Sequence, residues 1–232
     1  MSPELFARYN DASFDWTPLN ELRHLLPRYL EEIDAFRFPS EESVFHRFVE
    51  WENYSERDMK TLRSLFSDPA WTKEERDLID RWYRTFCAWF FLNYPVWEAD
   101  DHILEIRVDT VILLFAHGGF ALETLLEAWR RHLWSLPALL HLKDLLLYGF
   151  SDYFGKLNNA FASHDKTLRA MLLAWLKDTE TRMCFLAGCD AAIKRCDALL
   201  FEETRRYGTG MAHLDELEYT RETLLEWGRA GG

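Results

Sequence analysis

The sequence is poor in glycine and proline, and it lacks long apolar runs. Only 10 of its 232 residues are glycine and 7 are proline, and no Pro-, Gly- or Ser-rich linker divides the chain. No apolar run approaches the roughly 20 residues that a membrane-spanning helix needs, which argues against an integral membrane protein. Because 48% of the residues are hydrophobic and 16% are aromatic, the chain can bury a sizeable core, and disorder is excluded. We expect a single domain over residues 1–232.

Basic residues are scarce relative to acidic ones. The chain has 27 Lys and Arg against 39 Asp and Glu, a net charge of -12. This charge repels nucleic-acid phosphates and anionic lipid surfaces, so we expect neither as a partner, whereas a protein with a basic surface suits it. The first sixteen residues also lack the basic-then-apolar order of a signal peptide, which predicts a cytoplasmic protein.

The chain is also poor in cysteine. A long cytoplasmic chain with an aromatic core needs no disulfides, so we expect reduced thiols at Cys87, Cys184, Cys189 and Cys196. The last three are spaced by five and seven positions along one predicted helix, unlike the short Cys pairs of zinc sites. They are interpreted as small buried hydrophobic residues.

Helical periodicity and helix-capping residues dominate what is present. Thr72 and Glu75 form a capping-box pattern, Thr17-Pro18 is a typical helix start, and Ser135 and Thr179 are predicted helix caps. The patterns predict helices over residues 18–36, 40–50, a segment after Ser55, a segment after Thr72, and residues 103–116, 120–133, 136–148, 165–176, 180–206 and 211–227. Residues 149–163 are predicted to be irregular.

One of these segments leaves two interpretations. Residues 104–109 alternate with the period of a strand, but the apolar run from 103 to 116 is longer than most strands and ends at His117-Gly118-Gly119, as a helix does. A helix is therefore preferred. The fold class predicted is all-α, with about ten antiparallel helices. Because no sequence motif repeats, an irregular bundle and a short HEAT-like stack are both open.

Pro27 lies inside the first predicted helix. Proline removes one backbone hydrogen bond, so a kink is expected between Arg23 and Pro27. Arg28 either forms an ordinary surface pair with Glu32, or acts with His24 to satisfy the carbonyl that the proline leaves without a donor. Structural roles are assigned to Pro27 and Arg28.

Residues 25–31, Leu-Leu-Pro-Arg-Tyr-Leu-Glu, resemble the Phe/Leu-Leu-Pro-Arg-x-Leu-Glu signature near the N-terminus of a family of all-helical bacterial proteins that has no established activity. Looser similarities follow in the same order: residues 71–82, the helix with Trp129, His141-Leu142-Lys143-Asp144, residues 157–161 and Trp175-Leu176. The resemblance extends to about Phe185. It implies a bacterial source and an α fold, and it assigns no catalytic residue.

Four residues with metal-ligating side chains step along one face of a predicted helix: Glu98, His102, Glu105 and Asp109. Two-metal sites in helical bundles use a Glu-x-x-His pair and carboxylates from several helices, whereas this chain has the reverse order, His102-x-x-Glu105. The opposite face of that helix is apolar, so an ordinary surface stripe explains the pattern as well.

Catalytic motifs do not emerge from the sequence. His117-Gly118-Gly119 resembles the oxyanion loop of some lipases, but the chain has no Gly-x-Ser-x-Gly elbow. The segment from Gly149 to Lys156 resembles a phosphate-binding loop, but five residues separate its glycines and Leu157 stands where Ser or Thr is required. We predict no catalytic residue and no cofactor.

Residues 88–97 are apolar on all sides, so they are either buried or partly exposed. Burial is preferred. If the segment is exposed, its rings form a candidate partner-binding surface beside acidic residues. That surface consists of Trp89, Phe91, Tyr94 and Trp97.

Two functions from different classes follow. The first is a non-enzymatic, cytoplasmic helical module that binds a basic protein, as an adaptor or an immunity-type inhibitor does. The second is a metal-assisted enzyme that uses Glu98, His102 and Glu105.

Overall fold

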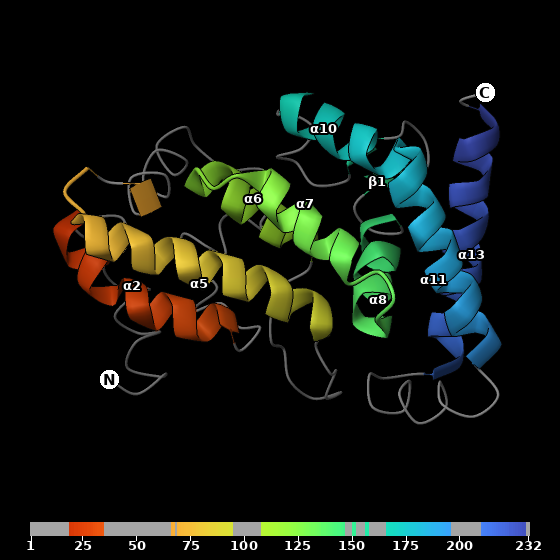
Figure 1. The fold of residues 1–232 in the computed structure, drawn as a ribbon, viewed down its shortest axis with the longest axis horizontal. Coiled ribbons are helices and arrows are strands. Elements are labelled where there is room, and N and C mark those ends of the chain that lie inside the picture. Colours follow the sequence, from red (N-terminus) through yellow and green to blue (C-terminus); the bar gives the residue numbers. More distant parts are fainter. Residues whose placement is uncertain are drawn as a thin grey trace. The chain divides into compact units, whose positions relative to one another are not determined.

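Helices make up nearly all of the described part of the chain, as the computed structural model shows (Figure 1). The structure describes residues 19–34, 66–67, 69–94, 108–146, 150–151, 156–157, 166–195 and 210–230. Within these ranges the helices are α2 (Leu19–Asp34), α5 (Lys73–Leu92), α6 (Val108–Gly118), α7 (Leu122–Arg131), α8 (Leu136–Asp144), α10 (Lys166–Lys177), α11 (Thr179–Arg195) and α13 (Gly210–Ala230). The all-α prediction is confirmed, with eight helices in the described ranges against about ten predicted for the whole chain. The helices predicted over residues 40–50 and after Ser55 lie outside these ranges.

A two-residue antiparallel pairing interrupts the helices. Strand β1 (Phe150–Ser151) pairs with β2 (Lys156–Leu157), so that Phe150 is opposite Leu157 and Ser151 is opposite Lys156. It falls within residues 149–163, which were predicted to be irregular. A pairing of two-residue strands leaves the fold class all-α.

The capping box predicted at the start of α5 is present. The Thr72 backbone N–H donates to the Glu75 carboxylate at 2.8 Å, and the Glu75 backbone N–H donates to Thr72 Oγ1 at 3.2 Å. These reciprocal bonds satisfy two backbone donors that the helix itself leaves without acceptors. The start of α5 is therefore set by local sequence.

The helix stop predicted at residues 117–119 is also confirmed. Helix α6 ends at Gly118, and Gly119 has φ 86°, a left-handed conformation that costs glycine little. The Phe120 N–H then donates to the Phe115 carbonyl at 3.0 Å, which closes the helix end in the usual six-residue pattern. Val108 and Asp109 are helical, whereas residues 103–107 lie outside the described ranges.

Ser135 caps α8 as predicted, since its Oγ accepts from the Ala138 N–H at 3.3 Å. The cap of α11 is corrected from Thr179 to Asp178. The Asp178 side chain accepts from the Thr181 N–H at 2.9 Å, and the Asp178 carbonyl accepts from the Arg182 N–H at 2.9 Å. An aspartate one position earlier thus takes the capping role, for which aspartate ranks above threonine.

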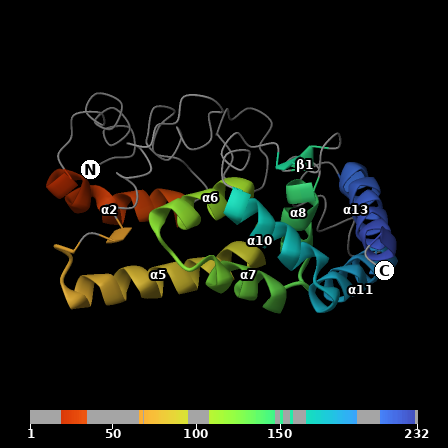
Figure 2. The same cartoon turned by 90° about the horizontal axis from the view of Figure 1, so that it is seen from above.

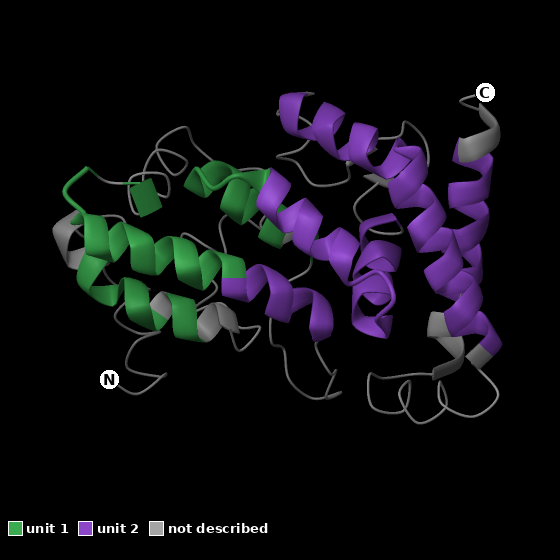
Figure 3. Ribbon diagram, viewed as in Figure 1, with its two compact units in different colours: residues 1–84, 102–122, 159–161 green, residues 85–101, 123–158, 162–232 purple. Residues whose placement is uncertain are grey.

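The described chain divides into two compact units (Figure 3). Unit 1 comprises residues 1–84, 102–122 and 159–161. Its described core is a cluster of rings in which Tyr83 contacts Phe115 at a centroid distance of 4.6 Å and Phe120 at 4.4 Å. The Tyr83 hydroxyl donates to the Ala121 carbonyl at 2.8 Å, so its polar end is satisfied. These contacts join α5 to α6 and to the residues after it.

Unit 2 comprises residues 85–101, 123–158 and 162–232. Here α11 and α13 lie side by side, and both pack on α8 (Figures 1 and 2). Its core is built around Trp129, which stacks on Phe91 at 4.7 Å and contacts Trp175 at 5.3 Å. The Trp129 Nε1–H donates to the Ala138 carbonyl at 3.0 Å, so α7 is also tied to α8.

The described cysteines are thiols that form no disulfide, and they lie in different environments. Cys87 and Cys189 are buried, and burial raises the pKa of Cys189 to about 12, so this thiol stays protonated. Cys184 is exposed, which corrects the expectation that it is buried. Cys196 lies outside the described ranges.

Candidate functional site

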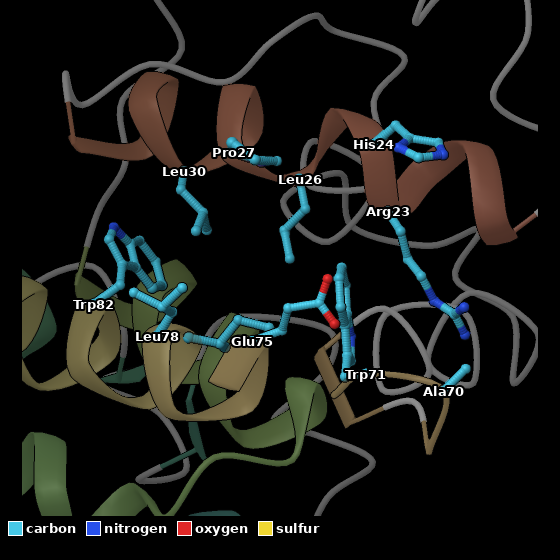
Figure 4. A pocket seen from close by; sticks show the side chains of 11 residues that line it. Arg23, His24, Leu26, Pro27, Leu30, Ala70, Trp71, Glu75, Leu78 and Trp82 are labelled. Atoms are coloured by element: carbon cyan, nitrogen blue, oxygen red, sulfur yellow. The ribbon is translucent and has the colours of Figure 1, made fainter. Parts of the chain in front are cut away.

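An apolar groove lies between α2 and the first half of α5, within unit 1 (Figure 4). Its volume is about 620 Å³, within the size range of ligand pockets. It is lined by Arg23, His24, Leu26, Pro27, Leu30, Ala70, Trp71, Glu75, Leu78, Ile79 and Trp82. The groove is therefore a candidate binding site for an apolar group.

Helical periodicity places these side chains on two facing surfaces. On α2, positions 23, 26, 27 and 30 share one face, and on α5 positions 75, 78, 79 and 82 do so. Leu26 and Ile79 are buried at 2% and 8% exposure, whereas Leu78 is 56% exposed. An apolar side chain this exposed beside buried ones leaves the groove accessible.

Charged groups gather at one end of the groove. The Arg23 guanidinium lies over the Trp71 ring, 5.5 Å from its centroid, in a cation–π contact. Figure 4 shows the Trp71 ring between Arg23 and the Glu75 carboxylate. At the other end the walls are formed by Leu30, Leu78 and Trp82 (Figure 4), so the site is polar at one end and apolar along the rest of its length.

Glu75 is ionised at neutral pH. Hydrogen bonds from the Thr72 backbone and side chain hold its pKa below the usual range, and the nearby charge of Arg23 acts in the same direction. Both bonds from Thr72 go to one carboxylate oxygen, Oε2. Within the described residues, Oε1 accepts no hydrogen bond, so it is available to a bound group.

Of the two structural residues predicted on α2, Pro27 lines this groove, whereas Arg28 is not among its lining residues. Helix α2 continues through Pro27, which lines the groove, and the predicted kink stays a prediction. Arg28 forms a surface ion pair with Glu31 at 2.6 Å, and the pair expected with Glu32 stays a prediction. The side chain of Glu32, the partner that the spacing favoured, is outside the described set.

In the described part of the aromatic segment, residues 88–94, the rings of Phe90, Phe91 and Tyr94 lie in the core. Phe91 is fully buried and Tyr94 is 5% exposed, so neither ring is presented on a surface. Trp89 is partly exposed, and Trp97 lies outside the described ranges. The partner-binding surface expected there is therefore not carried by Phe91 or Tyr94.

Of the predicted metal stripe, the structure describes Asp109 alone, and this residue is 5% exposed in the first turn of α6. Glu98, His102 and Glu105 lie outside the described ranges. Among the residues that the structure does describe, no group of three or more His, Cys, Asp or Glu side chains is placed to hold a metal ion.

Unit 2 contains a second cluster of ionisable groups. Lys143 Nζ lies 2.8 Å from Asp144 and 2.9 Å from Glu216, and the Tyr94 hydroxyl donates to the second Asp144 oxygen at 2.7 Å. Burial disfavours the charge on Lys143, but the two carboxylates outweigh it and raise the pKa of Lys143. The lysine is thus held as a cation between two carboxylates, and the cluster joins α8 to α13.

Sequence reasoning missed the groove. Trp71 lies in a segment that carries the family resemblance, and Leu78, Ile79 and Trp82 belong to a longer apolar stripe on α5. One signal was available in the sequence. The apolar stripe on α5 is wider than a helix needs in order to pack on a single neighbour. Which end of that stripe stays open depends on the tertiary structure.

Comparison of the chain with protein-family models, with curated proteins and with solved structures finds no match in any of the three. In the described part of the chain, no helix combines the length and the apolar character needed to cross a membrane.

Proposed function

We propose that the chain is a helical protein-interaction module, an adaptor or an immunity-type inhibitor, and that its groove between α2 and α5 binds an amphipathic segment of a basic partner. The observation that carries this proposal is the groove itself, in which Leu78 is 56% exposed while Leu26 and Ile79 are buried. Grooves of this kind receive the apolar face of a partner helix. About ten antiparallel helices, as a bundle or a HEAT-like stack, form the scaffold in this proposal.

The charge of the chain supports a basic partner. Unit 1, which contains the groove, has 13 Lys and Arg against 20 Asp and Glu, a net charge of -7 in the sequence. Complementary charge steers association and disfavours acidic competitors. An amphipathic segment with apolar anchors and basic flanks therefore fits both the groove and its surroundings.

The test is selection of displayed 16-residue helical peptides on the purified chain. Selected peptides are then measured by fluorescence anisotropy on the wild type, on Leu78→Ser and on Leu92→Ser. Leu92 is the matched control, because it is an exposed leucine on the same helix that does not line the groove. We expect binding to weaken about tenfold in Leu78→Ser and less than twofold in Leu92→Ser.

Three outcomes would contradict the proposal. They are the absence of any enriched peptide, binders that tolerate Leu78→Ser, and self-association that Leu78→Ser abolishes, which would make a second copy of the chain the occupant.

Membership in the helical bacterial family is proposed on residues 25–31 alone. The metal-assisted enzyme stays an alternative prediction, because its residues Glu98, His102 and Glu105 lie outside the described ranges.

A further inference from the structure

From the polar end of the groove, we infer that the Glu75 carboxylate binds a lysine or arginine side chain of the partner, placed three or four residues from the apolar side chain that enters the groove. This inference rests on the proposed function. The Glu75 carboxylate is then the feature by which the groove selects among amphipathic segments.

The position of Glu75 carries the inference. Its carboxylate lines the groove, and Figure 4 shows it directed into the space beneath Leu26. Thr72 engages Oε2 through both its backbone N–H and its hydroxyl, each at 2.8 Å, which fixes the carboxylate in place. A carboxylate held in advance loses little side-chain entropy when a cation binds to Oε1.

The residues around Glu75 favour a long basic side chain. Trp71 lines the groove beside the carboxylate and provides an apolar wall along which the methylene stem of a lysine can lie. The Arg23 guanidinium lies over the Trp71 ring, and that ring lies between it and Glu75 (Figure 4). The Glu75 carboxylate and the Arg23 guanidinium therefore do not form a contact ion pair.

The spacing of the partner's residues follows from α5. Glu75 precedes Leu78 and Ile79 by three and four positions. About one helical turn therefore separates the carboxylate from these two apolar side chains. A partner helix that runs along α5 meets both when its basic and apolar residues are also one turn apart. The predicted recognition pattern is a basic residue and an apolar residue at i and i+3 or i+4, in either order.

The test uses the peptides selected for binding in the groove. Each Lys or Arg is replaced singly by norleucine, which keeps an aliphatic stem and removes the charge. Affinities are measured on the wild type, on Glu75→Gln and on Glu74→Gln. Glutamine at position 75 can retain the capping box, and Glu74 is a carboxylate in the same helical turn that does not line the groove.

We expect one basic position per peptide, three or four residues from an apolar anchor, at which norleucine weakens binding about tenfold on the wild type and on Glu74→Gln. On Glu75→Gln the same replacement should change the affinity less than twofold. Equal losses on all three proteins would overturn the inference, since the basic residues would then act through overall charge. Peptides that depend on Leu78 but not on Glu75 would refute this inference alone, whereas peptides indifferent to Leu78 refute the proposed function as well.

Discussion

The Lys143 ammonium and the Glu216 carboxylate lie 2.9 Å apart and join two helices that are distant in sequence, α8 and α13. The Lys143 side chain is 3% exposed, and Asp144 lies on it at 2.8 Å. A surface pair with a similar distance, Lys73 with Asp77 at 2.6 Å, has side chains that are 77% and 57% exposed. The two pairs therefore differ chiefly in burial.

The first prediction compares the two pairs by double-mutant cycles. We expect the cycle of Lys143→Met with Glu216→Gln to give a coupling energy of about 1–3 kcal/mol, because water does not reach Lys143 to replace Glu216, although Asp144 stays at 2.8 Å. The cycle of Lys73→Met with Asp77→Asn should give at most about 0.5 kcal/mol. The measurement is the free energy of unfolding in urea. Equal coupling in the two cycles would show that the buried cluster contributes no more than a surface pair.

The second prediction concerns acid stability and His141. This ring is buried against Phe90 at a centroid distance of 4.2 Å, and its Nε2 lies 2.9 Å from the Asn93 carbonyl. Burial lowers the pKa of His141 from 6.5 to about 4, outweighing the opposite effect of Asp144. The unfolded chain therefore takes up a proton below pH 6.5 that the folded chain refuses until about pH 4. Stability should fall across that window by roughly 3 kcal/mol from this group alone.

A matched variant isolates the contribution of His141. His141→Gln keeps a side-chain N–H donor but has no group that titrates, and other carboxylates and histidines titrate alike in both proteins. We expect the wild type to lose its stability advantage over His141→Gln by roughly 3 kcal/mol as the pH falls from 7 to 4. A difference that is constant with pH would show that the pKa of His141 is the same in the folded and the unfolded chain.

Helix ends set by local chemistry were predictable from the sequence. The Thr72–Glu75 capping box and the stop at Gly118 and Gly119 depend on residues within a few positions of each other. Asp178 shows the limit of this reasoning, because two adjacent residues both suit a helix cap and the sequence pattern does not decide between them.

The candidate site depends on contacts that the sequence does not encode locally. An apolar stripe such as that of α5 predicts burial, but the residues left uncovered depend on which helices pack against it. Leu78 and Ile79 are neighbours in sequence, yet one is 56% exposed and the other 8%. Likewise, nothing adjacent to Lys143 in sequence indicates that Glu216 completes its ion pairs.

The third prediction concerns a close contact between α11 and the turn before α8. A Cβ atom added at Gly188 would lie 2.5 Å from the Leu133 carbonyl oxygen and 3.0 Å from a Leu139 methyl group. The backbone cannot yield as a flexible side chain would, so Gly188→Ala should lower the free energy of unfolding by about 1–3 kcal/mol. This loss is expected despite the gain of about 1 kcal/mol that alanine normally brings to a helix.

The neighbouring residue calibrates the Gly188 experiment. Ala187 is exposed on the same helix, so Ala187→Gly reports the helix propensity alone. A Gly188→Ala variant that is more stable than the wild type, by the amount that Ala187→Gly loses, would mean that α11 does not approach Leu133 closely.

The fourth prediction concerns Pro27, which we expect to serve stability. Proline carries no amide hydrogen, so it cannot donate to the carbonyl of Arg23, and a proline inside a helix costs about 3 kcal/mol relative to alanine. Its presence in α2 indicates that the backbone path it imposes is needed by the packing of its neighbours, and Leu26 is 2% exposed.

Pro27→Ala brings two opposing effects. The restored hydrogen bond stabilises α2, while a straighter helix moves Leu26 and Leu30 relative to a core that tolerates little displacement. We expect packing to dominate, with a loss of about 1–3 kcal/mol in a denaturant titration. Because Pro27 also lines the groove, groove peptides should bind the variant more weakly. An unfolding midpoint equal to or above that of the wild type, with the same slope, would show that the proline is only tolerated there.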